Sequence, residues 1–146
     1  MKITMSHNQS KINWEELCEL YKIAPLGIKV LDDLKCSFFN SRFKCFIFDG
    51  CNLVGVGRAL ADGKDCSYIC DIAVHPEYQG IGLGKKIVQS LIEQSHGHKK
   101  IILYANSGKE EFYYKLGFKR MITAMAIFQN EDDAIKQGII SEIPPK

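Results

Sequence analysis

A glycine-rich loop followed by two lysines is the part of this sequence best suited to bind a ligand. It contains Gly80, Gly82, Gly84, Lys85 and Lys86. Glycine adopts a positive φ without strain and has no Cβ that would keep a ligand away from the backbone. Apolar residues at helical spacing begin at Leu83, and the free N–H groups at the start of such a helix attract anions. Because ammonium groups nearby strengthen phosphate binding, the pattern predicts an anion-binding site at residues 79–84.

An acidic residue, Asp71, lies inside the apolar segment that precedes this loop. Residues 67–74 carry apolar side chains at both sets of alternate positions, which predicts a central strand. Pro76 has no N–H group to continue a sheet, so the strand is expected to end near His75. Burial in such a strand disfavours the charged form of a carboxyl group. Asp71 is therefore a candidate for proton exchange.

The rest of the pattern predicts the elements that hold this strand and loop. Helical spacing indicates a helix capped by Asn13 and ended before Pro25, and further helices at residues 29–39, 82–95 and 108–116. Strand-like runs occupy residues 2–6, 44–48, 53–61, 67–74, 100–104 and 121–128. The turn pairs Asp49-Gly50 and Asp62-Gly63 predict hairpins. A helix joins strand 67–74 to strand 100–104, so these two are expected to be parallel neighbours.

Length and composition limit the classes of protein that fit. At 146 residues and 46% hydrophobic composition, the chain is expected to form one domain over residues 1–146, with residues 131–146 as a loosely packed tail. The formal charge is only +2 and no apolar run reaches about 20 residues, so neither a nucleic acid nor a membrane is an expected partner. Six cysteines without a C-x-x-C pair, and an N-terminus without a signal peptide's apolar core, indicate a cytoplasmic protein without a metal site.

Two segments of the chain together resemble the GNAT superfamily of N-acetyltransferases. The first, Gln79-Gly80-Ile81-Gly82-Leu83-Gly84, is similar to that family's Q/R-x-x-G-x-G/A signature. The second, Phe112-Tyr113-Tyr114-Lys115-Leu116-Gly117-Phe118, is similar to its other recurrent segment. Their order and separation also match, and the resemblance covers roughly residues 44–128. It implies an α/β fold with a mixed, splayed sheet of about six to seven strands and about four helices.

The resemblance also implies acetyl-CoA as cosubstrate, in a cleft between the strands at 67–75 and 100–104. The glycine loop would hold the pyrophosphate, and backbone groups of Ile72 and Val74 would hold the pantetheine arm like an added strand. The residues expected to bind the cofactor are Ile72, Ala73, Val74, Gln79, Gly80, Ile81, Gly82, Leu83, Gly84, Lys85, Asn106 and Tyr113. An ordinary loop role explains Asn106 about as well.

The chemistry of acetyl transfer to an amine calls for a base and an acid. The neutral amine is the nucleophile, but an alkylamine has a pKa of about 10.4. Asp71 is the expected base, with a structural or amine-anchoring role as the alternative, and His75 and Tyr68 are substitutes. Tyr113 occupies the family's tyrosine position and is the expected acid for the leaving thiolate, with a core tyrosine as the alternative.

The sequence thus predicts an N-acetyltransferase that moves the acetyl group of acetyl-CoA directly to a primary amine. The N–H of Val74 is expected to stabilise the oxyanion. Near-neutral charge favours a small-molecule acceptor. Two alternatives stay open, a protein N-terminal or lysine acetyltransferase and a non-catalytic acetyl-CoA-binding module. An exposed edge along strand 121–128 would serve a homodimer.

Overall fold

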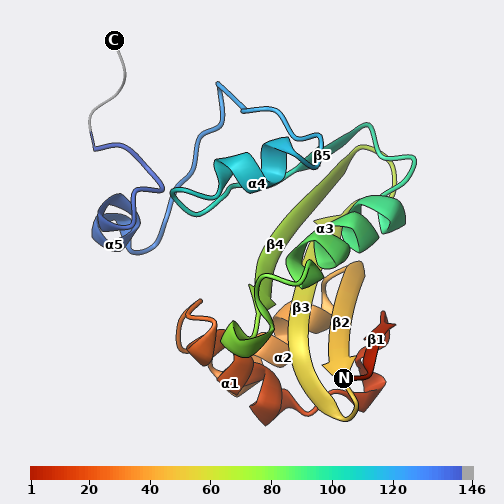
Figure 1. Ribbon diagram of the computed structural model, residues 1–146. Coiled ribbons are helices and arrows are strands. Elements are labelled where there is room, and N and C mark those ends of the chain that lie inside the picture. The colour runs from red at the N-terminus through yellow and green to blue at the C-terminus, as the bar shows by residue number, and fades with distance from the viewer. Residues whose placement is uncertain (143–146) are drawn as a thin grey trace. The chain divides into compact units, whose positions relative to one another are not determined.

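In the computed structural model, which describes residues 1–142, the chain forms two compact units, Met1–Leu103 and Tyr104–Lys146. The first unit is a sheet with helices on both faces (Figure 1). Its elements, in chain order, are β1 (Ile3–Ser6), the 3₁₀ turn η1 (Gln9–Lys11), α1 (Trp14–Ile23), α2 (Leu31–Phe39), β2 (Phe43–Asp49), β3 (Asn52–Ala61), β4 (Cys66–Val74), the 3₁₀ turn η2 (Pro76–Tyr78), α3 (Leu83–Gln94) and β5 (Lys100–Ile102). Each α-helix and strand lies within a few residues of its predicted range.

The strands of this sheet lie in the order β1-β2-β3-β4-β5. Neighbours from β1 to β4 are antiparallel, which confirms the hairpins predicted from the two Asp-Gly pairs. β5 pairs with β4 in parallel because α3 returns the chain to the same end of the sheet. This pairing begins with Cys66 opposite Lys100 and ends with Tyr68 opposite Ile102. From Ile69 to Val74, β4 therefore has no strand beside it on that side within the described part of the chain.

Two glycines on β3 allow α3 to approach the sheet closely. A Cβ at Gly57 would lie 2.7 Å from Cγ2 of Ile87 and 3.0 Å from Cδ1 of Leu91, and one at Gly55 would lie 3.0 Å from Cδ1 of Ile87. Ile87 and Leu91 are fully buried in return. Burial of each such side chain contributes roughly 1.5–3 kcal/mol to folding. The position of α3, and so of the glycine loop at its N-terminus, depends on this contact.

The opposite face of the sheet is covered by α1 and α2. Phe38 of α2 stacks on Phe46 of β2 with 5.7 Å between ring centroids, and both rings are fully buried. Asn13 caps α1 as predicted, because its side chain accepts a hydrogen bond from the N–H of Glu16 at 3.0 Å. The carboxylate of Glu16 accepts a hydrogen bond from the N–H of Leu53 at 3.1 Å, which ties α1 to the start of β3.

The second unit contains α4 (Glu110–Tyr114) and α5 (Glu131–Lys136). Gly117 has a φ of +98°, but α4 ends at Tyr114 with Lys115 as its C-cap, so the predicted C-cap lies two residues too late. The predicted loose tail instead contains α5, which Asn130 caps by accepting from the N–H of Asp133 at 3.0 Å, and Ala134 of this helix is buried. Residues 143–146 of that tail lie outside the described residues.

The prediction of a strand at residues 121–128 is wrong. The segment forms no strand, and the side chains of Ile122, Met125 and Ile127 are each more than 90% exposed. Alternating apolar residues form a strand only when a neighbouring strand supplies hydrogen bonds, and the described part of the second unit contains none. The chain thus has five strands over residues 1–142 instead of six to seven, and five α-helices instead of four. The predicted dimer edge also has no strand to carry it.

Candidate functional site

The glycine loop has the open geometry expected of an anion site. Gly80 and Gly82 have φ values of +83° and +87°, and a Cβ at either residue would meet no protein atom within 4 Å. Gly82 is the N-cap of α3, and no side chain forms a capping hydrogen bond with the first amides of this helix. Gly84 differs from the expectation because it lies in the first turn of α3 and not in the positive-φ region. Lys85 beside it is exposed.

Two residues named as cofactor contacts through this loop have opposite environments. Leu83 is only 3% exposed, so its side chain anchors α3 in the core and only its backbone N–H can face a ligand. The side chain of Ile81 is 51% exposed. The loop therefore offers backbone amides together with one free apolar side chain.

The free side of β4 presents backbone groups to the space beyond it. The N–H of His75 donates to the carbonyl oxygen of Val54 on β3 at 2.8 Å. Backbone groups of alternate residues in a strand point to opposite edges, so those of Val74, and by the same alternation Ile72, point away from β3. This is the side on which β4 has no strand partner from Ile69 onward within residues 1–142. An extended ligand could bind there as an additional strand would.

The side chains at this end of β4 are already engaged with the protein. Ala73 is buried in the core formed with α1 and α2. Ile72 lies on the face of α3, because a Cβ at Gly57 would be 3.4 Å from its Cγ1. Gln79 donates through Nε2 to the carbonyl oxygen of Val74 at 3.2 Å, so this side chain reaches back to the open edge. For these residues, backbone atoms are the groups left for a ligand.

A β-bulge changes the direction of the chain at Asp71. The register with β3 pairs Val56 with Ala73 and Arg58 with Cys70, so β4 has one extra residue between the two pairs. Asp71 takes a φ of +56° at this bulge, which is unusual for a residue other than glycine. The bulge turns the Asp71 side chain toward Arg58, whose pairing partner across the ladder is Cys70. The carboxylate therefore lies on the same face as α1 and α2.

The Asp71 carboxylate is held by cations rather than isolated in an apolar strand. Its Oδ2 accepts hydrogen bonds from Nε of Arg58 at 2.9 Å and from Nη2 at 2.8 Å. Its Oδ1 lies 3.8 Å from Nζ of Lys29. The hydroxyl of Tyr21 donates to the backbone carbonyl of Asp71 at 2.7 Å, which supports the bulge. The apolar strand around Asp71 does not reveal these cations, because they come from other elements of the fold.

Arg58 becomes a functional candidate through contacts that its sequence position does not predict. The sequence favoured a plain surface role, with substrate binding or pairing with Asp62 as alternatives, but its side chain is only 15% exposed. Nη1 donates to Oγ of Ser41 at 3.1 Å, and the guanidinium lies 5.9 Å from the ring centroid of Phe38. The sequence signal that could have placed Arg58 near Asp71 is the register of the hairpin. Once the turn at Asp62-Gly63 is fixed, residue 58 lies opposite residue 70.

Burial keeps two groups around Asp71 protonated. Burial, followed by the charge of Asp71, raises the pKa of the Tyr21 hydroxyl well above its usual value. Burial also raises the pKa of the Cys70 thiol to about 11. At neutral pH the phenol of Tyr21 therefore remains a hydrogen-bond donor, and Cys70 is a poor nucleophile because the thiolate is the reactive form.

The two expected substitute bases, His75 and Tyr68, lie at different places, since His75 directly follows β4 and Tyr68 lies within it. Nδ1 of His75 accepts a hydrogen bond from the N–H of Glu77 at 3.1 Å. In a neutral imidazole the other nitrogen then carries the proton, so His75 has no free acceptor nitrogen. Tyr68 is the last residue of β4 that pairs with β5, where it lies opposite Ile102.

Comparison with known proteins identifies the family of this chain. The sequence pattern of the Acetyltransferase (GNAT) family matches residues 11–118. This chain belongs to the GNAT family. It is 41% identical over 68 residues to the uncharacterized N-acetyltransferase ycf52 of Pyropia yezoensis, which covers 45% of this chain and 39% of that protein. The glucosamine 6-phosphate N-acetyltransferase of Trypanosoma brucei brucei is 41% identical over 59 residues, or 39% of this chain and 40% of that protein.

The fold of this GNAT chain is also found among solved structures. A probable acetyltransferase of Staphylococcus aureus matches with a TM-score of 0.76 and 23% identity, over 86% of this chain and 97% of that chain. This confirms the mixed α/β GNAT fold predicted from the two motifs. The aligned part spans about two fifths of the curated relatives, and the name of one of them specifies an acceptor. Acetyl-CoA is the cosubstrate of the family, but the acceptor differs among its members.

Two predicted site residues of this GNAT chain lie in its second unit. Tyr113 of α4 contacts Phe112 and Phe118 edge-on, with ring centroids 5.0 and 5.8 Å away. Burial raises the pKa of its phenol, so it carries a proton at neutral pH. Asn106 lies in the turn before α4, where its carbonyl oxygen accepts from the N–H of Lys109 at 3.0 Å. This bond uses the main-chain carbonyl of Asn106, so the role of its side chain stays a prediction.

No helix in residues 1–142 combines the length and apolar character needed to cross a membrane. No group of three or more His, Cys, Asp or Glu side chains in that part of the chain is arranged to hold a metal ion.

Proposed function

We propose that this protein is an N-acetyltransferase that moves the acetyl group of acetyl-CoA directly to a primary amine of a small molecule. The observation that carries the proposal is the free side of β4 from Ile69 to Val74, which leads directly into the open glycine loop. An extended arm and a pyrophosphate are the two parts of CoA that such a surface would recognise. The single domain over residues 1–146 is part of this proposal.

The chain's own residues fit CoA along this surface. Backbone amides of residues 80–84 and the positive end of α3 would bind the pyrophosphate, with Lys85 beside it. Backbone groups of Ile72 and Val74 would bind the pantetheine arm, and the N–H of Val74 would stabilise the oxyanion. The thioester would then lie along β4 on the side of Asp71, away from the loop.

The proposed chemistry is a direct transfer without a covalent enzyme intermediate. Oδ1 of Asp71 receives a hydrogen bond from the acceptor amine and a proton as the C–N bond forms. The C–S bond breaks, and the phenol of Tyr113 gives its proton to the leaving thiolate. The raised pKa of Cys70 supports a mechanism without a cysteine nucleophile, because that thiol stays protonated at neutral pH.

The site at Asp71 also supports the amine-anchoring alternative for this residue. Arg58 binds Oδ2 of this carboxylate, which leaves Oδ1 for an ammonium group of the acceptor. Asp71 would then bind the ammonium form first, and this group would lose one proton to water before the neutral amine attacks. All six cysteines are free, which supports the cytoplasmic location predicted from the sequence.

Turnover and CoA binding test this function separately. With acetyl-CoA and n-butylamine as probes, we expect thiol release that requires both. Replacement of Tyr113 by Phe removes the proton donor, so kcat should fall by about 10²-fold or more while calorimetric CoA affinity stays within about twofold. Unchanged kcat would remove Tyr113 from the mechanism. CoA binding without thiol release from any amine in a panel would favour the non-catalytic module.

A pair of matched glycine variants tests the cofactor site. Gly82→Val places a side chain where a ligand would lie, and no protein atom is within 4 Å of its Cβ. Gly97, after α3, has a similar φ of +92° and equally open surroundings. Gly82→Val and the control Gly97→Val should each lose about 1–2 kcal/mol of stability, because valine is strained at a positive φ. Only Gly82→Val should also weaken CoA binding, by about tenfold or more. Equal CoA affinities of the two variants would contradict binding of CoA at the glycine loop.

A further inference from the structure

The ammonium group of Lys29 lies in a position suited to a ligand. It is 5.3 Å from the ring centroid of Tyr21 and 3.8 Å from Oδ1 of Asp71. An aromatic face and a carboxylate oxygen are the two features that recognise a primary ammonium. The second oxygen of the same carboxylate is filled by Arg58, so Oδ1 is the oxygen that remains for another cation.

The contact between Lys29 and Asp71 is loose. At 3.8 Å, the distance from Nζ to Oδ1 is longer than that of a hydrogen bond, which for a charged pair is about 2.7–2.9 Å. Both side chains are partly exposed, at 29% and 24%. Solvent-exposed ion pairs of this kind add little stability. A ligand that could approach Oδ1 more closely would therefore displace Lys29 at small cost.

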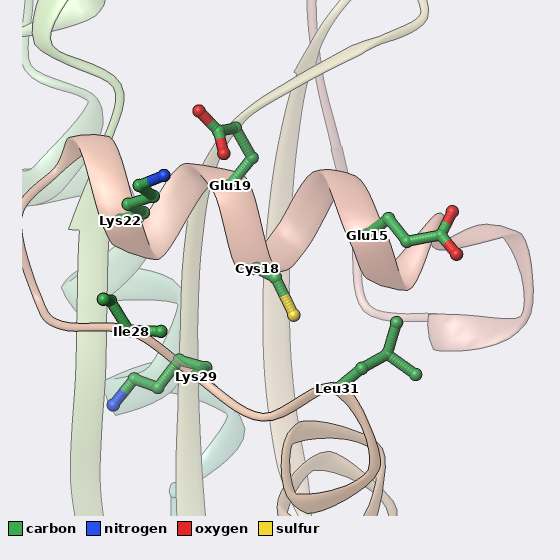
Figure 2. Close-up of a pocket in the computed structure, with 7 residues that line it drawn as sticks. All are labelled: Glu15, Cys18, Glu19, Lys22, Ile28, Lys29 and Leu31. Atoms are coloured by element: carbon green, nitrogen blue, oxygen red, sulfur yellow. The ribbon is translucent and has the colours of Figure 1, made fainter.

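Lys29 also belongs to a segment that can move without disturbing the core. Gly27, two residues earlier, has φ +107° and no protein atom within 4 Å of a Cβ built on it. The flanking residues Ile28 and Val30 are 87% and 62% exposed. Figure 2 shows Lys29 between α1 and the start of α2, at the edge of a hollow of about 280 Å³, with its ammonium pointing away from Glu15.

We propose that Lys29 occupies the ammonium site of the acceptor and competes with it. The acceptor would be a primary alkylammonium, because the lysine side chain that fits between Tyr21 and Asp71 is itself a butylammonium. The inference rests on the proposed function, and it names how that site recognises its acceptor. Binding of the acceptor displaces Lys29 from Oδ1, which places the acceptor's nitrogen at the bulge of β4.

Replacement of Lys29 by Met tests this competition. Met keeps an unbranched apolar stem but removes the charge. With acetyl-CoA saturating, KM for n-butylamine should fall about three- to tenfold while kcat changes less than about twofold. Lys29→Arg keeps a positive charge at this position, so KM should not fall as it does in Lys29→Met. The matched control is Lys22→Met, which removes one positive charge from the same hollow and should change neither constant.

A binding measurement separates this inference from the proposed function. Titration of CoA-free protein with n-butylammonium, followed by NMR, should show about three- to tenfold tighter binding to Lys29→Met than to wild type. The neutral probe n-butanol should bind both proteins equally. Equal affinity of n-butylammonium for both proteins, or a higher KM in Lys29→Met, would overturn the inference. If no amine is acetylated but the affinities differ as expected, the proposed function fails and the ammonium site stands.

Discussion

The carboxylates of Asp71 and Asp62 show how much a side chain depends on its neighbours. Asp71 lies inside a strand, and Asp62 lies in the turn that follows another strand. Asp71 binds Arg58, which lies 13 residues earlier in the chain, and its backbone binds Tyr21, which lies 50 residues earlier. Asp62 binds its own turn, where its Oδ1 accepts from the N–H groups of Lys64, Asp65 and Cys66. The partners of Asp62 are therefore local, whereas those of Asp71 come from distant parts of the chain.

The hydrogen bonds of Asp62 predict how the free energy of unfolding depends on pH in acid. Hydrogen bonds from the backbone lower the pKa of Asp62 from 3.8 to about 2. The unfolded chain therefore binds more protons than the folded chain between these values, and stability rises with pH across that range. This contribution is complete above about pH 4 and is lost as the pH falls through about 2.

Asp62→Asn should reduce that pH dependence, because Asn keeps an oxygen acceptor in the turn but has no charge to titrate. The free energy of unfolding, measured with urea from about pH 2 to about pH 5, should rise less steeply in the variant than in wild type. Identical slopes would mean that Asp62 does not have a lowered pKa in the folded protein.

Among the elements, α3 and β4 decide where a cofactor could bind. α3 approaches β3 because Gly55 and Gly57 lack side chains, and its N-terminus is thereby fixed beside the end of β4. β4 has a free side because β5 pairs with only its first three residues. The sequence predicted the parallel neighbours and their splayed arrangement. It did not predict the bulge at Asp71, which needs the register of two strands to be seen.

Gly57→Ala should therefore destabilise the first unit. The new Cβ would lie 2.7 Å from Ile87 and 3.0 Å from Leu91, and both are fully buried, so α3 has to shift. Overpacking of this kind costs about 1–3 kcal/mol in urea unfolding. Gly55→Ala is the matched control on the same strand, and its closest contact of 3.0 Å to one terminal methyl predicts a smaller loss. A larger loss for Gly55→Ala would contradict this explanation.

For the whole molecule, the two compact units raise the question of cooperativity. The boundary lies between Leu103 and Tyr104, yet the GNAT family pattern continues across it to residue 118. We therefore expect the chain to unfold as one domain, with a single calorimetric transition whose calorimetric and van't Hoff enthalpies agree. Two separate transitions would show that the units fold independently. Gly57→Ala offers a check, since it should lower the midpoint of the whole transition.

Much of this protein follows from local signals in its sequence. Pro76 marks the end of β4, Asn13 caps α1, and Asp-Gly pairs mark the hairpin turns, because each of these acts on neighbouring backbone. The spacing of apolar residues along the sequence then predicts the helices and strands of the first unit. The glycine loop is equally local, since positive φ and a missing Cβ are properties of single residues.

Tertiary structure alone decided which groups surround Asp71 and which apolar segments pair. Arg58, Tyr21 and Lys29 reach Asp71 from three other parts of the chain, and no local pattern specifies that meeting. The segment at residues 121–128 alternates like a strand but forms none, because a strand exists only with a partner. The sequence thus determined the glycine loop and the family resemblance. The surroundings of Asp71 depend on contacts between distant residues, which only the folded chain creates.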